Sequence, residues 1–269
     1  MRAPGRRGVT LIEVAVTVGL FSLVAVVLAL AIQESSRVYR QLSSETEAQS
    51  ALRQAELALD GDLRSASIAQ MATALVPDSL GGGGNDGSAL WFLSPRDPVT
   101  GVVHHKADGS PFWQRNILYY LVVPADHDQL FGYTCTGGAG PGGMDDRCPH
   151  KVLIRKVIDL APATDPADEA TEETLLPEVT DYLTRPAGYD TSGMSAEPGL
   201  QEVSIVARKL IFFRVTLAPV PASWPNEVEI DVRATSIEEA EKSVRVGSVA
   251  LGTGPFTTQQ LISVFTPND

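Results

Sequence analysis

Residues 6–13, RRGVTLIE, lead into nineteen residues, 14–32, that carry no ionisable side chain, and this stretch decides the fold. At about 1.5 Å of rise per residue, a helix of that length is about 28 Å long, close to the thickness of a bilayer core. Residues 1–8 contain three arginines and no acid, so by the positive-inside tendency the N-terminus stays in the cytoplasm. The sequence therefore predicts a membrane-spanning half-helix over residues 9–33, with the rest of the chain beyond the membrane.

Glu13 is an acidic residue at the N-terminal end of this span. A charged side chain costs about 2.5–3.5 kcal/mol at the centre of a membrane helix and less toward its ends, so the position needs an explanation. In one interpretation Glu13 lies at the headgroup level or is stabilised by the positive end of the helix dipole. In the other, the chain is cut after Gly8, and the new α-amino group of Val9 on a neighbouring chain neutralises the carboxylate.

The stretch resembles the prepilin signature of type IV pilins and type II secretion pseudopilins. The resemblance implies that residues 1–8 are a leader peptide and that a membrane peptidase cleaves the chain between Gly8 and Val9. It also implies that the new N-terminus, Val9, is methylated and that Glu13 serves subunit assembly. Val9 departs from the family, in which this position is most often Phe or Met.

The resemblance implies a location and a set of partners as well. Before assembly the chain would cross the inner membrane once, with its N-terminus in the cytoplasm and its head in the periplasm. Afterwards it would belong to a pilus or pseudopilus. Its partners would be the prepilin peptidase, the inner-membrane assembly platform and, through the N-terminal helix, the major pilin and other minor pilins or pseudopilins.

A secretory signal peptide is the rival interpretation of the same residues. It would use the small-x-small sequence at residues 29–31 as its cleavage site, and Arg6-Arg7 would suit a twin-arginine signal. Two features argue against it. The apolar run is longer than the usual 7–15 residues, and Glu13 lies where signal peptides avoid charge.

Residues 34–76 are predicted to continue the helix as an amphipathic half. Apolar residues at spacings of three and four share one helical face, namely Val38, Leu42, Leu52, Ala55, Leu59, Leu63 and Ala66. We expect this face to pack against a sheet rather than in a coiled coil, because the heptads are irregular and rich in alanine. Residues 57–66 resemble the pattern that closes the long helix in W-type minor pilins and J-type pseudopilins.

Residues 77–269 are predicted to form a globular β-rich head with long loops. Runs of β-branched, aromatic and aliphatic residues predict strands at 89–93, 116–123, 151–160, 203–217, 227–233 and 243–249. The C-terminal residues 260–269 are predicted to form a last strand and an extended tail. Successive strands joined by turns favour an antiparallel sheet. The expected fold class is therefore α+β and pilin-like, with one long N-terminal helix packed on an antiparallel sheet.

Residues 161–199 are acidic and rich in turn-forming residues, with Arg185 as the single cation. The acids are Asp165, Asp168, Glu169, Glu172, Glu173, Glu178, Asp181, Asp190 and Glu197. Such segments are mostly solvated loops, which is what we expect here. Calcium binding is a weaker alternative, because the spacing fits no EF-hand loop.

Cys135 and Cys148 flank a glycine-rich stretch. In an oxidising periplasm we expect them to form a disulfide, which would stabilise the fold by about 3 kcal/mol, and two free thiols are the alternative. A metal site is not expected, because the four histidines are scattered in the sequence and none belongs to a paired zinc-ligand motif.

Net charge and the absence of enzyme motifs argue against two further classes of function. The net charge of −12 makes a nucleic-acid partner unlikely, and no motif of a hydrolase, metalloprotease or nucleotide-binding enzyme is present, so neither an enzyme nor a cofactor is predicted. The function favoured is that of a minor pilin or pseudopilin that primes a filament or sits at its tip. A tip-located adhesin or binding module, and a secreted enzyme with a Sec-type signal peptide, are the alternatives.

Overall fold

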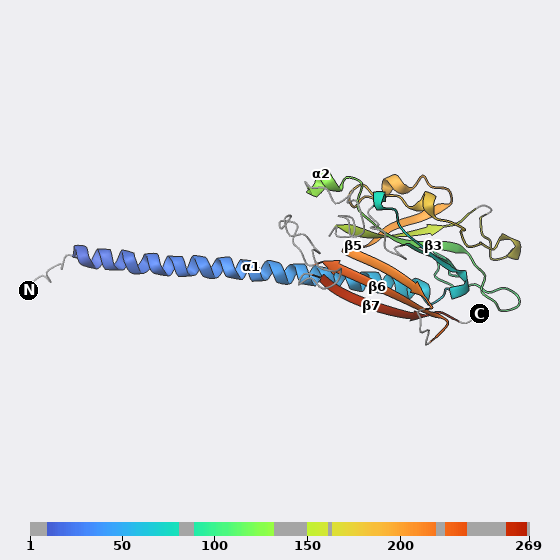
Figure 1. Ribbon diagram of the computed structural model, residues 1–269, viewed down its shortest axis with the longest axis horizontal. Helices are drawn as coiled ribbons and strands as arrows, with labels where there is room; N and C mark the ends of the chain where they lie inside the picture. The colour runs from blue at the N-terminus through green and yellow to red at the C-terminus, as the bar shows by residue number, and fades with distance from the viewer. Residues whose placement is uncertain are drawn as a thin grey trace, which may run out of the picture. The chain divides into compact units, whose positions relative to one another are not determined.

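The computed structural model describes residues 10–80, 89–131, 150–160, 163–218, 224–235 and 257–267. The chain divides into two compact units, Met1–Ser43 and Ser44–Asp269. The long helix α1 (Leu11–Leu63) contributes to both units (Figure 1).

The first unit contains the apolar part of α1. Its side chains are exposed throughout, with Leu11 at 87% and Phe21 at 74% exposed. An 18-residue window of this helix has a mean hydropathy of 2.7, and no part of that window is buried by the rest of the chain. By length and composition this helix can span a membrane, a criterion that a cleaved signal sequence also meets.

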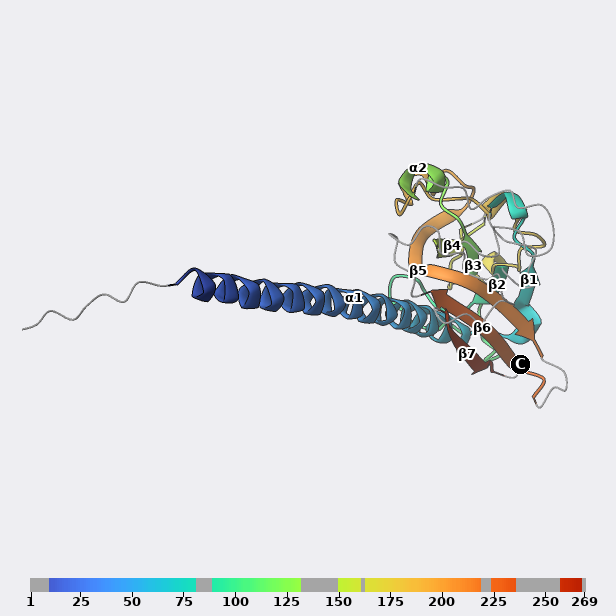
Figure 2. The ribbon, with the colours of Figure 1, turned by 60° about the vertical axis from the view of Figure 1, so that its left-hand side comes forward.

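The second unit is built on a seven-stranded antiparallel sheet in which each strand pairs with the next strand along the chain (Figure 2). Its strands are β1 (Met71–Ala74), β2 (Ala89–Ser94), β3 (Arg115–Val122), β4 (Lys151–Ile158), β5 (Leu200–Leu217), β6 (Glu227–Thr235) and β7 (Thr257–Phe265). The strands predicted from the apolar runs are thus confirmed in type and position, apart from 243–249, which lies outside the described residues.

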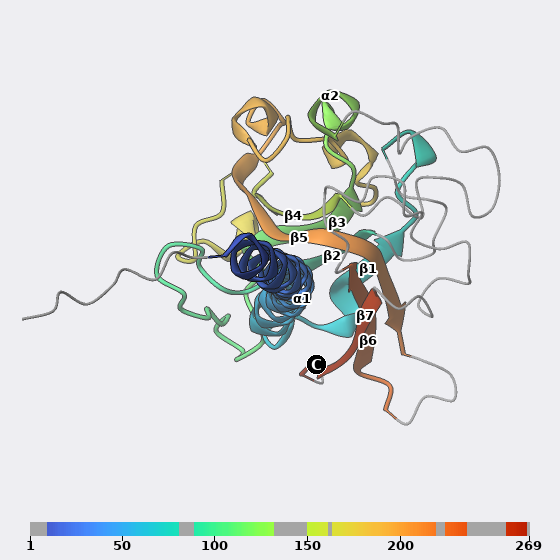
Figure 3. The same cartoon turned by 90° about the vertical axis from the view of Figure 1, so that its left-hand side faces the viewer.

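The sheet bends within β5. The first part of this strand, up to Leu210, pairs with β4, and the part from Leu210 onward pairs with β6. Register shifts mark the change of partner, and Lys209 has a φ of 60° there, a left-handed conformation that is uncommon for residues other than glycine. The bend lets the sheet curve around the part of α1 that belongs to the second unit (Figure 3).

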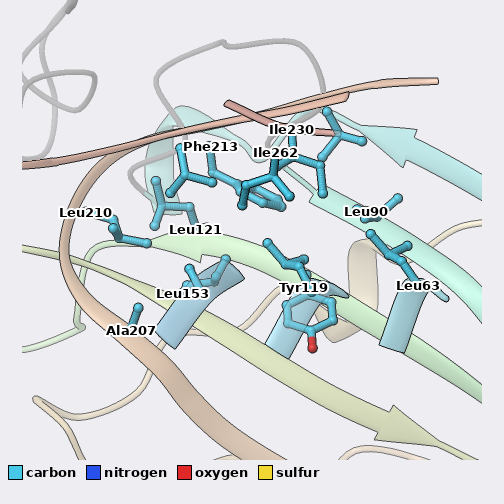
Figure 4. Packing of buried hydrophobic residues seen from close by; sticks show 14 of the residues in the cluster. Leu63, Leu90, Tyr119, Leu121, Leu153, Ala207, Leu210, Phe213, Ile230 and Ile262 are labelled. Atoms are coloured by element: carbon cyan, nitrogen blue, oxygen red, sulfur yellow. The ribbon is translucent and has the colours of Figure 1, made fainter. Parts of the chain in front are cut away.

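The concave face of the sheet buries α1 from Ser44 to Leu63. The buried helix residues are Ser44, Ala48, Ala51, Leu52, Ala55, Leu59 and Leu63. They pack against inward-facing residues of β2 to β7, among them Leu90, Tyr119, Leu153, Phe213, Ile230 and Ile262 (Figure 4). The small side chains of Ala48, Ala51 and Ala55 take little space between helix and sheet, which allows close approach. The prediction that this half packs on a sheet is confirmed.

Two details of the predicted amphipathic half-helix were wrong. First, α1 ends at Leu63 instead of reaching residue 76, and residues 71–74 form β1. Beyond the end of the helix, the Ser67 side chain caps a 3₁₀ turn (Ile68–Gln70) by accepting a hydrogen bond from the Ala69 N–H. Second, the buried stripe begins at Ser44, since Val38 and Leu42 are 47% and 56% exposed.

The opposite face of the sheet is covered by the described part of the acidic segment, residues 163–199. Five of its apolar side chains are buried there, those of Leu176, Val179, Tyr182, Leu183 and Met194. They pack on sheet residues such as Trp91, whose indole N–H donates to the Leu176 carbonyl at 2.8 Å. The expectation of a solvated loop was therefore wrong for this segment, which forms a third layer of the head while most of its acids stay at the surface.

Candidate functional site

The N-terminus of α1 brings Thr10 and Glu13 together. The Glu13 carboxylate accepts hydrogen bonds from the Thr10 N–H at 2.8 Å and from its hydroxyl at 3.0 Å. The Glu13 N–H donates in return to the Thr10 hydroxyl oxygen at 3.3 Å. This reciprocal pattern is a capping box, which satisfies N–H groups that have no partner within the helix. Sequence reasoning considered the helix dipole for Glu13 but missed Thr10 as its partner, although the pattern Thr-x-x-Glu signals it.

The capping box does not neutralise the charge of Glu13. Within the described part of the chain, no cation forms an ion pair with this carboxylate. Gly8 and Val9, the predicted cleavage and methylation positions, lie outside the described residues, and so do Cys135 and Cys148. Glu13 therefore has two distinguishable properties, an acceptor that caps its own helix and a negative charge that remains available to a cation from elsewhere.

The other end of α1 is fixed to the sheet by Asp62. Its carboxylate accepts hydrogen bonds from the Tyr119 hydroxyl at 2.6 Å and from Arg155 Nε at 2.7 Å. Burial, and next the negative charge of Asp62, raise the pKa of Tyr119, so its hydroxyl stays protonated and donates. Asp62 belongs to residues 57–66, the segment that resembles the helix end of W-type minor pilins and J-type pseudopilins. Its carboxylate lies on the side of the helix that faces the sheet, where it accepts from these two donors.

Two further contacts hold charged residues of α1 that the sequence alone would leave solvated. Gln260 of β7 donates to the Glu56 carboxylate at 2.7 Å. Lys209 of β5, at the bend of the sheet, forms an ion pair with Glu47. These contacts fix the helix to β5 and β7, whereas Asp62 fixes it to β3 and β4.

Lys156 lies on the face of β4 that points away from α1, toward the covering segment 163–199, and is fully buried. Its ammonium contacts both Glu197 oxygens at 2.6 Å and donates to the Tyr182 carbonyl at 2.7 Å. Burial lowers the pKa of Lys156, while the Glu197 carboxylate opposes that shift. The pair connects the sheet to the covering segment 163–199.

Glu173 is the second acid of that segment that turns inward, and its side chain makes stability depend on pH. It accepts hydrogen bonds from the Leu160 N–H and the Asn116 amide. Burial raises the pKa of Glu173 to about 7 from its ordinary value of 4.5, and the nearby Asp159 charge adds to the shift. The folded chain therefore binds this proton more tightly than the unfolded chain does, so this contribution to stability is full below about pH 4.5 and is lost as pH rises toward 7.

We expect the glutamine variant Glu173→Gln to remove this pH dependence. Between pH 5 and pH 8 the wild type should lose about 1–2 kcal/mol more stability than the variant, less than the full shift would give because solvent screens part of it. Denaturant unfolding of the full chain in detergent, followed by tryptophan fluorescence, measures the free energy of unfolding of the two proteins at each pH. Equal pH slopes for the two proteins would contradict the assignment.

The four histidines do not share one place. His104 and His105 lie near the surface between β2 and β3, whereas His127 and His150 are buried and in contact. Across the part of the chain that the structure describes, no group of three or more His, Cys, Asp or Glu side chains could hold a metal ion. The acidic segment accordingly offers no calcium cluster among its described residues.

Comparison with known proteins adds no relative. The chain matches no protein-family model, no curated protein and no solved structure. Its function must be inferred from the residues and contacts described above.

Proposed function

We propose that this chain is a minor pilin or pseudopilin, a structural subunit that primes a type IV pilus or related filament, or sits at its tip, after prepilin peptidase cleavage. One observation carries the proposal. Helix α1 is continuous, yet its residues 14–32 are uncharged and exposed, whereas its residues from Ser44 to Leu63 are packed against the sheet. We expect such a helix in a subunit that inserts the first half of the helix into a membrane or a filament and packs the second half against its own head.

The exposed half needs an apolar environment both before and after assembly. Hydrocarbon buries residues 14–32 while the subunit is in the inner membrane, and the helices of neighbouring subunits bury them in the filament. Exchange of lipid contacts for helix contacts keeps the apolar surface out of water at every stage. The subunit can then leave the membrane without the large free-energy cost of exposing this apolar surface to water.

Glu13 supplies the attraction that the apolar surface lacks. Its charge has no ion-pair partner among the described residues, and the proposed cleavage after Gly8 creates an α-amino group on Val9 of each subunit. Within a low-dielectric surrounding, an amine of one subunit and the carboxylate of the next attract strongly. The partners are therefore the major pilin and other minor pilins or pseudopilins, together with the prepilin peptidase and the inner-membrane assembly platform.

Two features support a low-copy subunit of the W type or J type. The segment 57–66 resembles the helix end of those groups, and in this chain its Asp62 holds the helix end against the sheet. The head is also large for a major pilin, which suits a priming or tip position.

Co-purification tests the proposal. The full chain, tagged at its C-terminus, is extracted from membranes in mild detergent, and the accompanying proteins are identified by mass spectrometry. We expect other chains with prepilin signatures in the same complex. Recovery of the tagged chain from the soluble periplasmic fraction, without such companions, would contradict the proposal.

A further inference from the structure

The two edge strands of the sheet differ in length. At one edge β1 has four residues, whereas β7 at the other edge has nine (Figure 1). Within the described residues, β6 is the only strand that pairs with β7, and the other edge of β7 makes no backbone hydrogen bond. In the described part of the chain this edge therefore presents a row of unpaired N–H and C=O groups, along a strand that is long for a globular protein.

Strand β7 lacks the features by which monomeric proteins protect a sheet edge. Those features are a charged side chain, a proline or a bulge that twists the edge away, and a very short strand such as β1 serves the same purpose. Residues 257–265, TTQQLISVF, contain no charge and no proline, and their pairing with β6 continues without a register shift. The edge is therefore regular and uncharged, which favours the addition of another strand.

The outer face of β7 also carries exposed apolar side chains. Side chains alternate along the strand, so Ile262 and Val264 are buried in the core with α1, while Leu261 and Phe265 are 57% and 52% exposed. A strand added beside β7 places its own side chains directly next to Leu261 and Phe265. Apolar surface that now faces water is then covered.

Strand β6 adds negative charge beside these side chains. Glu227 lies opposite Phe265 and Glu229 lies opposite Ser263, so the two acids share the outer face with them. Neither carboxylate forms an ion pair within the part of the chain that the structure describes. Two strand spacings of about 4.8 Å separate an added strand from β6, a distance that a lysine and a glutamate side chain together can bridge.

The remaining charges on this face of β6 are balanced. Asp231, opposite Leu261, forms an ion pair with Arg233 at 2.5 Å. On its other side, Arg214 of β5 lies opposite Asp231. The uncompensated negative charge is therefore confined to the two glutamates near the Phe265 end of β7.

We propose that the free edge of β7 binds an extended segment of another protein, which adds to the sheet as a further strand and carries lysine or arginine near the Phe265 end. Main-chain hydrogen bonds supply affinity, and the alternate side chains supply specificity. Apolar residues of the segment cover Leu261, and its cations approach Glu227 and Glu229. A second copy of this chain fits less well, because its own β7 brings no cation. The inference does not rest on the proposed assembly function.

Synthetic peptides with the nine-residue length of β7 are the probes. The basic peptide, Lys-Thr-Lys-Thr-Val-Thr-Lys-Thr-Lys, has the same side-chain pattern in both directions, so it suits parallel and antiparallel pairing. In the acidic peptide glutamate replaces each lysine. In the proline peptide two adjacent prolines near the centre remove N–H donors from both edges. Fluorescence anisotropy measures binding to the full chain in a non-ionic detergent, with empty micelles as the blank.

Two variants and a control locate the binding site. Leu261→Lys places a charge on the edge strand, and the double variant Glu227→Gln with Glu229→Gln removes the negative charge but leaves the edge unchanged. Val99→Lys is the matched control for Leu261→Lys, because Val99 is 91% exposed and lies between β2 and β3.

We expect the basic peptide to bind the wild type and Val99→Lys equally well. It should bind Leu261→Lys at least about tenfold more weakly and the glutamine double variant about three- to tenfold more weakly. The acidic and proline peptides should each bind the wild type at least about tenfold more weakly than the basic peptide does. If Leu261→Lys fails to fold, the glutamine double variant and the comparison of peptides still decide the outcome.

Any of three results would overturn the proposal. The first is a wild type that shows no saturable binding of the basic peptide. The second is equal binding of the basic peptide and either of the other two, because the site would then lack the preference for cations or the dependence on strand pairing. The third is a wild type that sediments as a dimer and becomes a monomer in Leu261→Lys, since a second copy would then occupy the edge.

Discussion

Glu13→Gln is expected to leave the head folded but to reduce incorporation of the subunit into the filament by at least about tenfold. The glutamine side-chain oxygen can still accept hydrogen bonds from Thr10, so the capping box is kept while the charge is removed. A lost attraction of about 1.4 kcal/mol already corresponds to a tenfold change in an equilibrium, and an ion pair within the bilayer exceeds that. Quantification of the subunit in sheared filaments, relative to its amount in membranes, measures the effect.

Thr10→Val is the matched control for that experiment. It removes the hydroxyl that both donates to Glu13 and accepts from its N–H, but it keeps the negative charge. We expect the helix to lose about 1 kcal/mol of local stability and incorporation to change much less than in Glu13→Gln. The opposite order, with normal incorporation of Glu13→Gln and failure of Thr10→Val, would show that Glu13 acts only as a helix cap.

The largest effect on stability is expected for Lys156→Met. The methionine keeps most of the apolar volume, but it leaves the Glu197 carboxylate without its cation in a buried place and leaves the Tyr182 carbonyl without its donor. Breaking a buried ion pair by removing one partner costs about 3–5 kcal/mol. Denaturant unfolding of the full chain in detergent, followed by tryptophan fluorescence, should show this loss.

Two further variants identify the cause. In the double variant Lys156→Met with Glu197→Leu no buried charge remains, so we expect it to recover most of the lost stability. Lys106→Met removes a more exposed ion pair, with Glu172 at 3.1 Å, and should cost less than about 1 kcal/mol. A double variant that is no more stable than Lys156→Met would show that packing, and not the buried charge, explains the loss.

The sequence predicts the main layers of the fold because their signals are local. The uncharged run 14–32 and the apolar spacing from Leu52 to Leu63 each point to a helix, and alternation in β6 points to a strand with one buried face. The elements that the sequence did not predict are formed through contacts between residues far apart in the chain. Strand β1 has only four residues, two of them alanines, which are depleted in strands, and its conformation comes from pairing with β2.

The same reason explains the errors around the sites. The acids of segment 163–199 conceal the spacing of apolar residues such as Leu176 and Tyr182, and the partners of those residues lie on strands far away in sequence. A useful signal was nevertheless present. Lys156 lies between Ile154 and Ile158 on one face of a strand, which indicates a buried cation that needs an acid.

The histidine pair had a signal too. Strands predicted at 116–123 and 151–160, if paired as antiparallel neighbours, place the residues just after the first and just before the second at the same sheet end. That reasoning would have brought His127 and His150 together before any coordinates. What it could not supply is the separation of the two ring nitrogens, since His127 belongs to the short helix α2 (His127–Phe131), which the sequence did not predict.

The mass of the mature N-terminal peptide tests the central claim most directly. We purify the native protein from filaments and membranes and sequence its N-terminal peptide by mass spectrometry. The account predicts a chain that begins at Val9 and carries one methyl group on its α-amino nitrogen. A chain in assembled filaments that still begins at Met1, or a mature protein that begins at Ile32 after removal of the whole apolar segment, would contradict it.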